Sequence, residues 1–176
     1  MAAPEDDRRT PRNIVSSAHL VSLGAEELSE FEYGLILAQN AFSRWTVRCM
    51  AAAGAPELGP LDVLVLHSVN HRDRAKQVAD ICFVLNVEDT HTVTYSLRKL
   101  EKLGLVGRDR RGKETHYAVT DAGAGVCTRY RQVREDCLVA ALSALGLNND
   151  ALGELAARLR ALSGLYDQAA RAATSL

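Results

Sequence analysis

The clearest alternation of apolar and polar positions lies in the middle of the chain, just before Gly104. Val93, Leu97 and Leu100 recur at spacings of four and three, which places them on one face of a helix. The opposite face is polar and carries His91, Tyr95, Arg98 and Lys102. We therefore predict an amphipathic helix over residues 88–103, ended by a glycine in the left-handed conformation.

The segments on either side of this helix predict a hairpin and two further helices. Residues 105–108 and 115–120 are predicted to pair as strands around a basic, glycine-containing tip. Upstream, Pro60 opens a helix, residues 74–76 supply a minor strand, and residues 77–85 form a second helix, with a turn at Asn86. This order of elements is typical of a winged helix-turn-helix, in which the hairpin is the wing.

Two longer helical stripes flank this unit. Apolar residues recur every three or four positions in two sets: Phe31, Leu35, Ala38, Phe42, Trp45 and Cys49, and Leu152, Leu155, Leu159, Leu162, Tyr166 and Ala169. A winged helix needs neither stripe, so we predict terminal helices that intertwine in a homodimer. The fold class is mainly α with a small β hairpin. The expected regions are a disordered tail (1–13), an N-terminal arm and long helix (14–58), the winged helix (59–120) and C-terminal dimerisation helices (121–176).

Charge is unevenly distributed along a chain whose net charge is only −1. Residues 96–113 contain seven basic and two acidic side chains, a balance of +5, whereas residues 17–70 contain two basic and six acidic ones, a balance of −4. A solvated surface would explain a charge run by itself. Its coincidence with the polar helix face and the hairpin favours a polyanion such as DNA.

The same residues resemble the MarR family of winged-helix transcription regulators. The resemblance rests on the run VTYSLRKLEKLGLVGR at 93–108, on Asp109-Arg110-Arg111, and on YAVTDAG at 117–123. It covers about residues 60–125, and it departs from the family in a short wing and in Val119, where leucine is usual. The resemblance implies a homodimer that binds a pseudo-palindromic operator, often released by a small ligand.

The expected DNA contacts follow from this arrangement. We predict contacts in the major groove or on the backbone from Thr90, His91, Thr92, Thr94, Tyr95, Arg98, Lys99, Arg108, Arg110, Arg111 and Lys113. Arginine can read guanine with two N–H donors, and wing arginines suit a narrow minor groove. Asp109 is expected to brace Arg111 rather than touch DNA, as the family's aspartate does.

A small-molecule effector is expected in the crevice between the first long helix and the helix that begins at Pro60. The candidate residues are Asn40, Ser43, Arg44 and Trp45. A cation beside an aromatic ring would suit an aromatic acid or a phenol. The alternative is that these residues form an ordinary helix surface around a core tryptophan.

Composition sets the remaining expectations. A chain of 176 residues, 47% hydrophobic and 24% charged, suits one globular domain, and no apolar run is long enough to span a membrane, so we expect a cytoplasmic protein without a cofactor. The sequence has no phosphate loop, nucleophile elbow or paired carboxylates, so we expect no enzyme.

Three other readings stay open. The four cysteines lack metal or disulfide spacing and favour burial, although Cys49 beside Arg48 could sense redox state. His67 and His71 are spaced to chelate a metal ion on a helix. Finally, the winged helix could bind protein instead of DNA.

Overall fold

The computed structural model describes residues 18–142, 145–146 and 148–176. As predicted, the chain is mainly helical with a two-stranded antiparallel sheet. Its elements are η1 (Ala18–Leu20), α1 (Glu26–Ala52), α2 (Pro60–Asn70), η2 (His71–Asp73), α3 (Val78–Leu85), α4 (Thr90–Lys102), β1 (Val106–Arg111), β2 (Glu114–Val119), α5 (Asp121–Arg134), η3 (Glu135–Val139, a π-helix), α6 (Ala140–Leu142) and α7 (Asn149–Ala173). The tail predicted over residues 1–13 and the start of the arm lie outside the described residues.

Helix α2 begins at Pro60, where the missing N–H costs nothing because the first helical N–H groups have no partner within the helix. The N–H of Gly59 donates to Asp62 Oδ2 at 2.9 Å and so caps the first turn. After α3, Asn86 takes a left-handed φ of 52° and reverses the chain, as predicted for the turn. These two features fix how α2 and α3 enter the motif.

Helix α4 begins at Thr90, two residues later than predicted. The reason is that Asp89 acts as the N-cap: its carboxylate accepts the N–H of His91 at 2.8 Å and its own backbone is extended. The predicted apolar stripe is confirmed, because Val93, Leu97 and Leu100 are fully buried. Helix α4 is therefore attached to the core along one whole face.

The hairpin is longer than the sequence analysis predicted. All six residues of β1 pair with β2, from Val106 opposite Val119 to Arg111 opposite Glu114. The connecting loop is only Gly112 and Lys113, and Gly112 adopts a φ of 65°, which a tight two-residue loop requires. The wing arginines thus lie within a strand. The predicted minor strand over residues 74–76 reduces to a single bridge between Lys76 and Tyr117.

The core joins the winged helix to the end of α1 and to α5. Its buried apolar residues come from the C-terminal turn of α1, from α2, α3 and α4, from β1 and β2, and from α5. A close approach locks α5 beneath the wing: a Cβ added to Gly123 would lie 2.1 Å from the carbonyl oxygen of Leu105. Only glycine fits at that position, which explains the glycine in the 117–123 segment.

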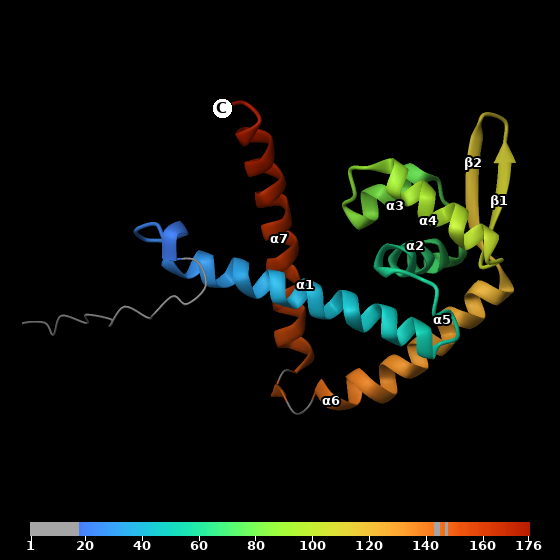
Figure 1. Cartoon of the computed structure of the whole chain (residues 1–176), viewed down its shortest axis with the longest axis horizontal. Coiled ribbons are helices and arrows are strands. Elements are labelled where there is room, and N and C mark those ends of the chain that lie inside the picture. Colours follow the sequence, from blue (N-terminus) through green and yellow to red (C-terminus); the bar gives the residue numbers. More distant parts are fainter. Residues whose placement is uncertain (1–17, 143–144, 147) are drawn as a thin grey trace, which may run out of the picture.

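Figure 1 shows that α2, α3, α4 and the hairpin gather at one end of the long helix α1, whereas α7 runs across α1 nearer its other end. The crossing of α7 and α1 includes a hydrogen bond from the Tyr166 hydroxyl to Glu32, at 3.2 Å. In the described part of α7 no residue is buried. None of the helices that the structure describes combines the length and apolar character needed to cross a bilayer.

Candidate nucleic-acid interface

The exposed face of α4 carries most of the residues predicted to read DNA. Thr90, His91, Thr92 and Arg98 are exposed and Thr94 is half-buried. Tyr95 stands out, because 71% of its surface is exposed although the opposite side of the helix is fully buried. A large aromatic ring held so far into solvent on a rigid helix is suited to contact a partner surface.

The threonines on this face are already hydrogen-bonded within the helix. The Thr92 hydroxyl donates to the Asp89 carbonyl at 2.7 Å, and the Thr94 hydroxyl donates to the Thr90 carbonyl at 2.8 Å. Their oxygens can still accept hydrogen bonds, and their methyl groups remain available for apolar contact. These residues therefore suit base amino groups and thymine methyls better than phosphates, which only accept.

Lys99 occupies a different environment from the other predicted DNA contacts. Its ammonium lies 2.6 Å from Asp62 Oδ2, in a pair between α4 and α2. Burial raises the pKa of Asp62, but hydrogen bonds from Lys99, Ser96 and the Gly59 N–H outweigh it and hold the pKa below its ordinary value. We therefore assign Lys99 to holding α4 on α2. Sequence analysis did not identify Asp62 as its partner, because the two residues are 37 positions apart.

The wing presents its cations on both faces, because side chains alternate along a strand. Arg108 and Arg110 share one face, and Asp109 and Arg111 share the other. Arg111 Nε donates to Asp109 Oδ2 at 2.9 Å, which is the bracing contact that the sequence predicts. Arg108 Nε lies 3.4 Å from Glu101 on α4.

These pairs divide the basic segment into two groups. Lys99, Arg108 and Arg111 have carboxylate partners within the protein. Among the residues that the structure describes, no ion pair is formed by Arg98, Lys102, Arg110 or Lys113. The second group supplies uncompensated positive charge on α4 and at the wing tip, where a phosphate backbone can approach.

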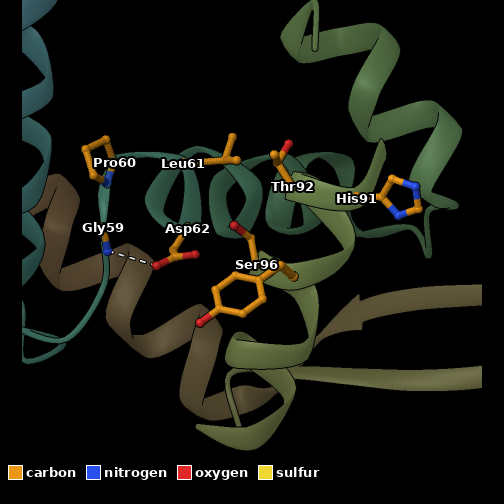
Figure 2. Close-up of a pocket in the computed structure, with 8 residues that line it drawn as sticks. Gly59, Pro60, Leu61, Asp62, His91, Thr92 and Ser96 are labelled. Carbon is orange, nitrogen blue, oxygen red and sulfur yellow. Dashed lines mark hydrogen bonds between the residues drawn. The ribbon is translucent and has the colours of Figure 1, made fainter. Parts of the chain in front are cut away.

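A pocket of about 520 Å³ lies beside this face, between α4 and the start of α2. Figure 2 shows the side chains of Asp62 and Ser96 next to one another where α2 meets α4, while His91 points away from them. Tyr95 and Thr92 also line the pocket. The exposed face of α4 is therefore hollowed on the side that adjoins α2.

The residues predicted to bind an effector lie on α1. Asn40 and Arg44 are exposed, and Ser43 and Trp45 are half-buried. Trp45 packs against the hydrophobic core. The pocket beside α4 includes none of these four residues, and neither does a second pocket between α2 and α5.

The cysteine and histidine candidates occupy different environments. Cys49 is buried and its thiol donates to the Tyr130 carbonyl at 3.5 Å; burial raises the pKa of that thiol, which opposes formation of a reactive thiolate. His67 lies against the ring of Tyr130, with ring centroids 4.5 Å apart, whereas His71 is exposed after the end of α2. In the part of the chain that the structure describes, no three potential metal ligands gather.

Comparison with known proteins identifies the unit built by these elements. A family model described as a winged helix DNA-binding domain matches residues 58–123. No curated protein matches the sequence. The match begins just before α2 and ends in the first turn of α5, so it contains both α4 and the wing. It describes a DNA-binding domain, in agreement with the sequence analysis.

Solved structures extend the similarity to the flanking helices. The transcriptional repressor CouR, solved with a 23-mer DNA duplex, has a TM-score of 0.64 and 23% identity; the match covers 81% of this chain and 99% of CouR. The MarR family regulator NMB1585 from Neisseria meningitidis has a TM-score of 0.63 and 15% identity, with coverage of 81% and 95%. The chain has the MarR fold. Together with the winged-helix match, this fold agrees with the resemblance drawn from residues 93–123.

A third similar structure comes from Bordetella bronchiseptica. It is BpsR, described with a mechanism for regulation of its DNA binding by 6-hydroxynicotinic acid. Its TM-score is 0.56 at 18% identity, and the match covers 75% of this chain and 98% of BpsR. The match therefore extends beyond the winged helix of residues 58–123.

Proposed function

We propose that this protein is a cytoplasmic repressor that binds a pseudo-palindromic operator as a homodimer and releases it when a small molecule binds. The observation that carries the proposal is the division of α4 into a fully buried apolar face and an exposed face with Tyr95 and Arg98. A helix fastened in this way can enter the major groove without losing its contacts to the domain.

Each part of the interface has a separate role in this proposal. The bases in the major groove are read by Thr90, His91, Thr92, Thr94, Tyr95 and Arg98, the last through its two N–H donors. Arg110 and Lys113 contact phosphates or the minor groove, and Arg108 and Arg111 are held in position by Glu101 and Asp109. The CouR structure with a DNA duplex supports this placement of the fold on DNA.

The homodimer is proposed from the apolar surface of the flanking helices. On α1, Ile36, Leu37 and Phe42 are each more than half exposed, and on α7 Leu155, Leu165 and Tyr166 are exposed. Exposed apolar patches on water-soluble proteins mark sites of protein–protein contact. We assign residues 14–58 and 121–176 to the dimer layer around the winged helix. Two copies would set two recognition helices one turn of DNA apart.

The effector is proposed to be an aromatic acid or a phenol. BpsR, whose DNA binding is regulated by 6-hydroxynicotinic acid, supports an organic acid as effector for this fold. The structure does not favour Cys49 as a redox sensor, because burial raises the pKa of its thiol. His71 lies beyond the end of α2, where the backbone is extended, so it does not share a helix face with His67, and this does not favour a metal sensor either.

DNA binding is tested with the segment upstream of the protein's own gene and a random duplex, by fluorescence anisotropy at several salt concentrations. Arg111→Ala is expected to lower affinity about tenfold or more with unchanged helicity, because it removes a braced wing cation. Arg160→Ala, an exposed arginine on α7, is the matched control. Wild-type affinity in Arg111→Ala would refute the wing assignment, and salt-insensitive or absent DNA binding would favour a protein-binding module.

Base reading is tested at Arg98. Arg98→Ala is expected to cost about 1 to 3 kcal/mol on the specific operator and to relax selectivity at one base pair. The measurement compares affinities for operators that differ at single positions. An equal loss on specific and random DNA would show that Arg98 contacts only phosphate.

A further inference from the structure

Glu114 opens the second strand of the wing, directly opposite Arg111 across the hairpin. Residues opposite one another in an antiparallel pair project to the same face, and an acid and a base in these positions attract each other. In the part of the chain that the structure describes, however, no ion pair joins Glu114 to Arg111. Arg111 Nε donates to Asp109 instead, at 2.9 Å. The carboxylate of Glu114 is therefore held by other residues.

The side chains that hold Glu114 lie at the start of α3 and on β2. The amide of Gln77, the residue before α3, donates to Glu114 Oε2 at 2.8 Å. His116 Nε2 lies 3.3 Å from the same oxygen and 3.5 Å from Gln77 Nε2. The side chain of His116 is only 17% exposed, against 64% for Glu114, so the ring has a fixed place on the strand. These contacts anchor Glu114 beside the start of α3.

Backbone contacts fix the position from which Gln77 reaches the wing. Lys76, its neighbour, exchanges two backbone hydrogen bonds with Tyr117 on β2, each of 2.8 Å. The backbone N–H of Gln77 donates to Asp80 Oδ2 at 2.9 Å and so caps the first turn of α3. Because this cap uses the backbone of Gln77, replacing its side chain leaves the start of α3 intact. The amide of Gln77 can therefore be removed to test the anchoring of Glu114 alone.

We propose that the anchoring of Glu114 keeps its carboxylate from neutralising Arg111, so that Arg111 stays available for a DNA phosphate. The bond to Asp109 uses Nε of Arg111, and the terminal nitrogens carry the remaining donors of the guanidinium. A released Glu114 pairs with these donors, because it lies opposite them and carries the opposite charge. Gln77 and His116 are thus positioning residues for the wing. This role rests on the proposed function, since it matters only where the wing contacts DNA.

The anchoring is tested first without DNA, by NMR of the full chain. The reporters are the side-chain amide resonances of Gln77 and the Nε–H resonance of Arg111, assigned by their loss in Gln77→Leu and Arg111→Ala. Glu114→Gln should shift the Gln77 resonances, whereas Glu88→Gln, at an exposed acid just before α4, should not. The double variant Gln77→Leu with His116→Phe should shift the Arg111 resonance, because Glu114 then moves to Arg111.

The consequence for DNA binding is tested by fluorescence anisotropy at several salt concentrations. The double variant should bind the operator about tenfold more weakly, and the slope of log K against log salt should fall by about one, as in Arg111→Ala. Adding Glu114→Gln should restore both the affinity and the slope, which also shows that the double variant folds. Adding Glu88→Gln should leave the slope lowered. In an Arg111→Ala background the double variant should cause no further loss.

The proposal is overturned if the double variant binds DNA like the wild type, or if Glu114→Gln does not restore the loss. An equal loss in the Arg111→Ala background would also overturn it, because Gln77 and His116 would then only support the fold. A chain with the expected resonance shifts but no salt-sensitive DNA binding would refute the proposed function and leave the anchoring of Glu114 standing. DNA binding without those shifts would refute the anchoring alone.

Discussion

Helices α4 and α7 are both amphipathic, but only α4 buries its apolar face within the chain. Four of the 13 residues of α4 are buried, Val93, Ser96, Leu97 and Leu100, whereas none of the 25 residues of α7 is. The stripe of α4 meets α2, α3 and β1. The stripe of α7 meets solvent over much of its length, with Leu155, Leu159 and Tyr166 exposed.

An apolar stripe on a helix can therefore indicate packing within the domain or packing against a separate surface. In α4 the stripe specifies packing inside one domain, so the helix is held rigidly and its polar face is aimed at a partner. In α7 an equally regular stripe lacks an internal partner, and burying it requires another surface. We propose that surface to be a second copy of the chain.

The largest effect is expected from breaking the α7 stripe. Leu155→Glu with Leu159→Glu would place two charges in the proposed dimer layer. We expect light scattering to show a monomer instead of a dimer, and operator affinity to fall about a hundredfold or more, because two linked half-site contacts become one.

Ala157→Glu is the control for this experiment, since residue 157 is exposed on the opposite side of α7. It should leave both the mass and the affinity unchanged. A double variant that remains dimeric would refute the role of α7, and a wild-type monomer would refute the dimer itself.

A smaller effect, confined to the stability of the winged helix, is expected from Gly123→Ala. The added Cβ would meet the Leu105 carbonyl oxygen at 2.1 Å and Val119 Cγ2 at 2.9 Å, both in the wing's base. We expect a loss of about 1 to 3 kcal/mol in the free energy of unfolding, measured with urea. Gly125→Ala, whose Cβ would meet only the flexible end of Arg129 at 3.5 Å, should be neutral or slightly stabilising. Equal effects of the two substitutions would contradict the close approach.

The smallest effect is expected from Asp62→Asn, which removes the charged partner of Lys99 while keeping the shape. Because the folded protein holds the pKa of Asp62 below its ordinary value, the ionised form stabilises the fold. That contribution is complete above the ordinary aspartate pKa and is lost as the pH falls through the lowered folded value. The variant should be about 1 to 2 kcal/mol less stable at pH 7, and the difference should shrink in acid. A difference independent of pH would argue against this pair.

The sequence predicted the elements whose signals are local. The stripe of Val93, Leu97 and Leu100, the proline at the start of α2 and the turn at Asn86 each depend on a few neighbouring residues, and the structure shows all of them. The wing was predicted too short because strand ends depend on pairing across the hairpin, which Gly112 allows to continue to Arg111.

Contacts between distant residues could not be predicted in this way. The sequence grouped Lys99 with the DNA-binding cations, because its charge and its place on the helix are like those of its neighbours. Its pairing with Asp62 depends on the angle between α4 and α2, which the packed core sets. The pocket between α2 and α5 likewise exists only because α5 returns to α2 after the wing.

By itself, the sequence determined the order of helices and hairpin, the polar face of α4 and the concentration of positive charge at residues 96–113. These follow from periodicity and composition, which act over a few turns of the chain. The tertiary structure alone decided which cations are paired within the protein, which glycine has no room for a side chain, and which apolar stripe remains uncovered. Those outcomes depend on distances between residues far apart in sequence, and only the packing of the core fixes them.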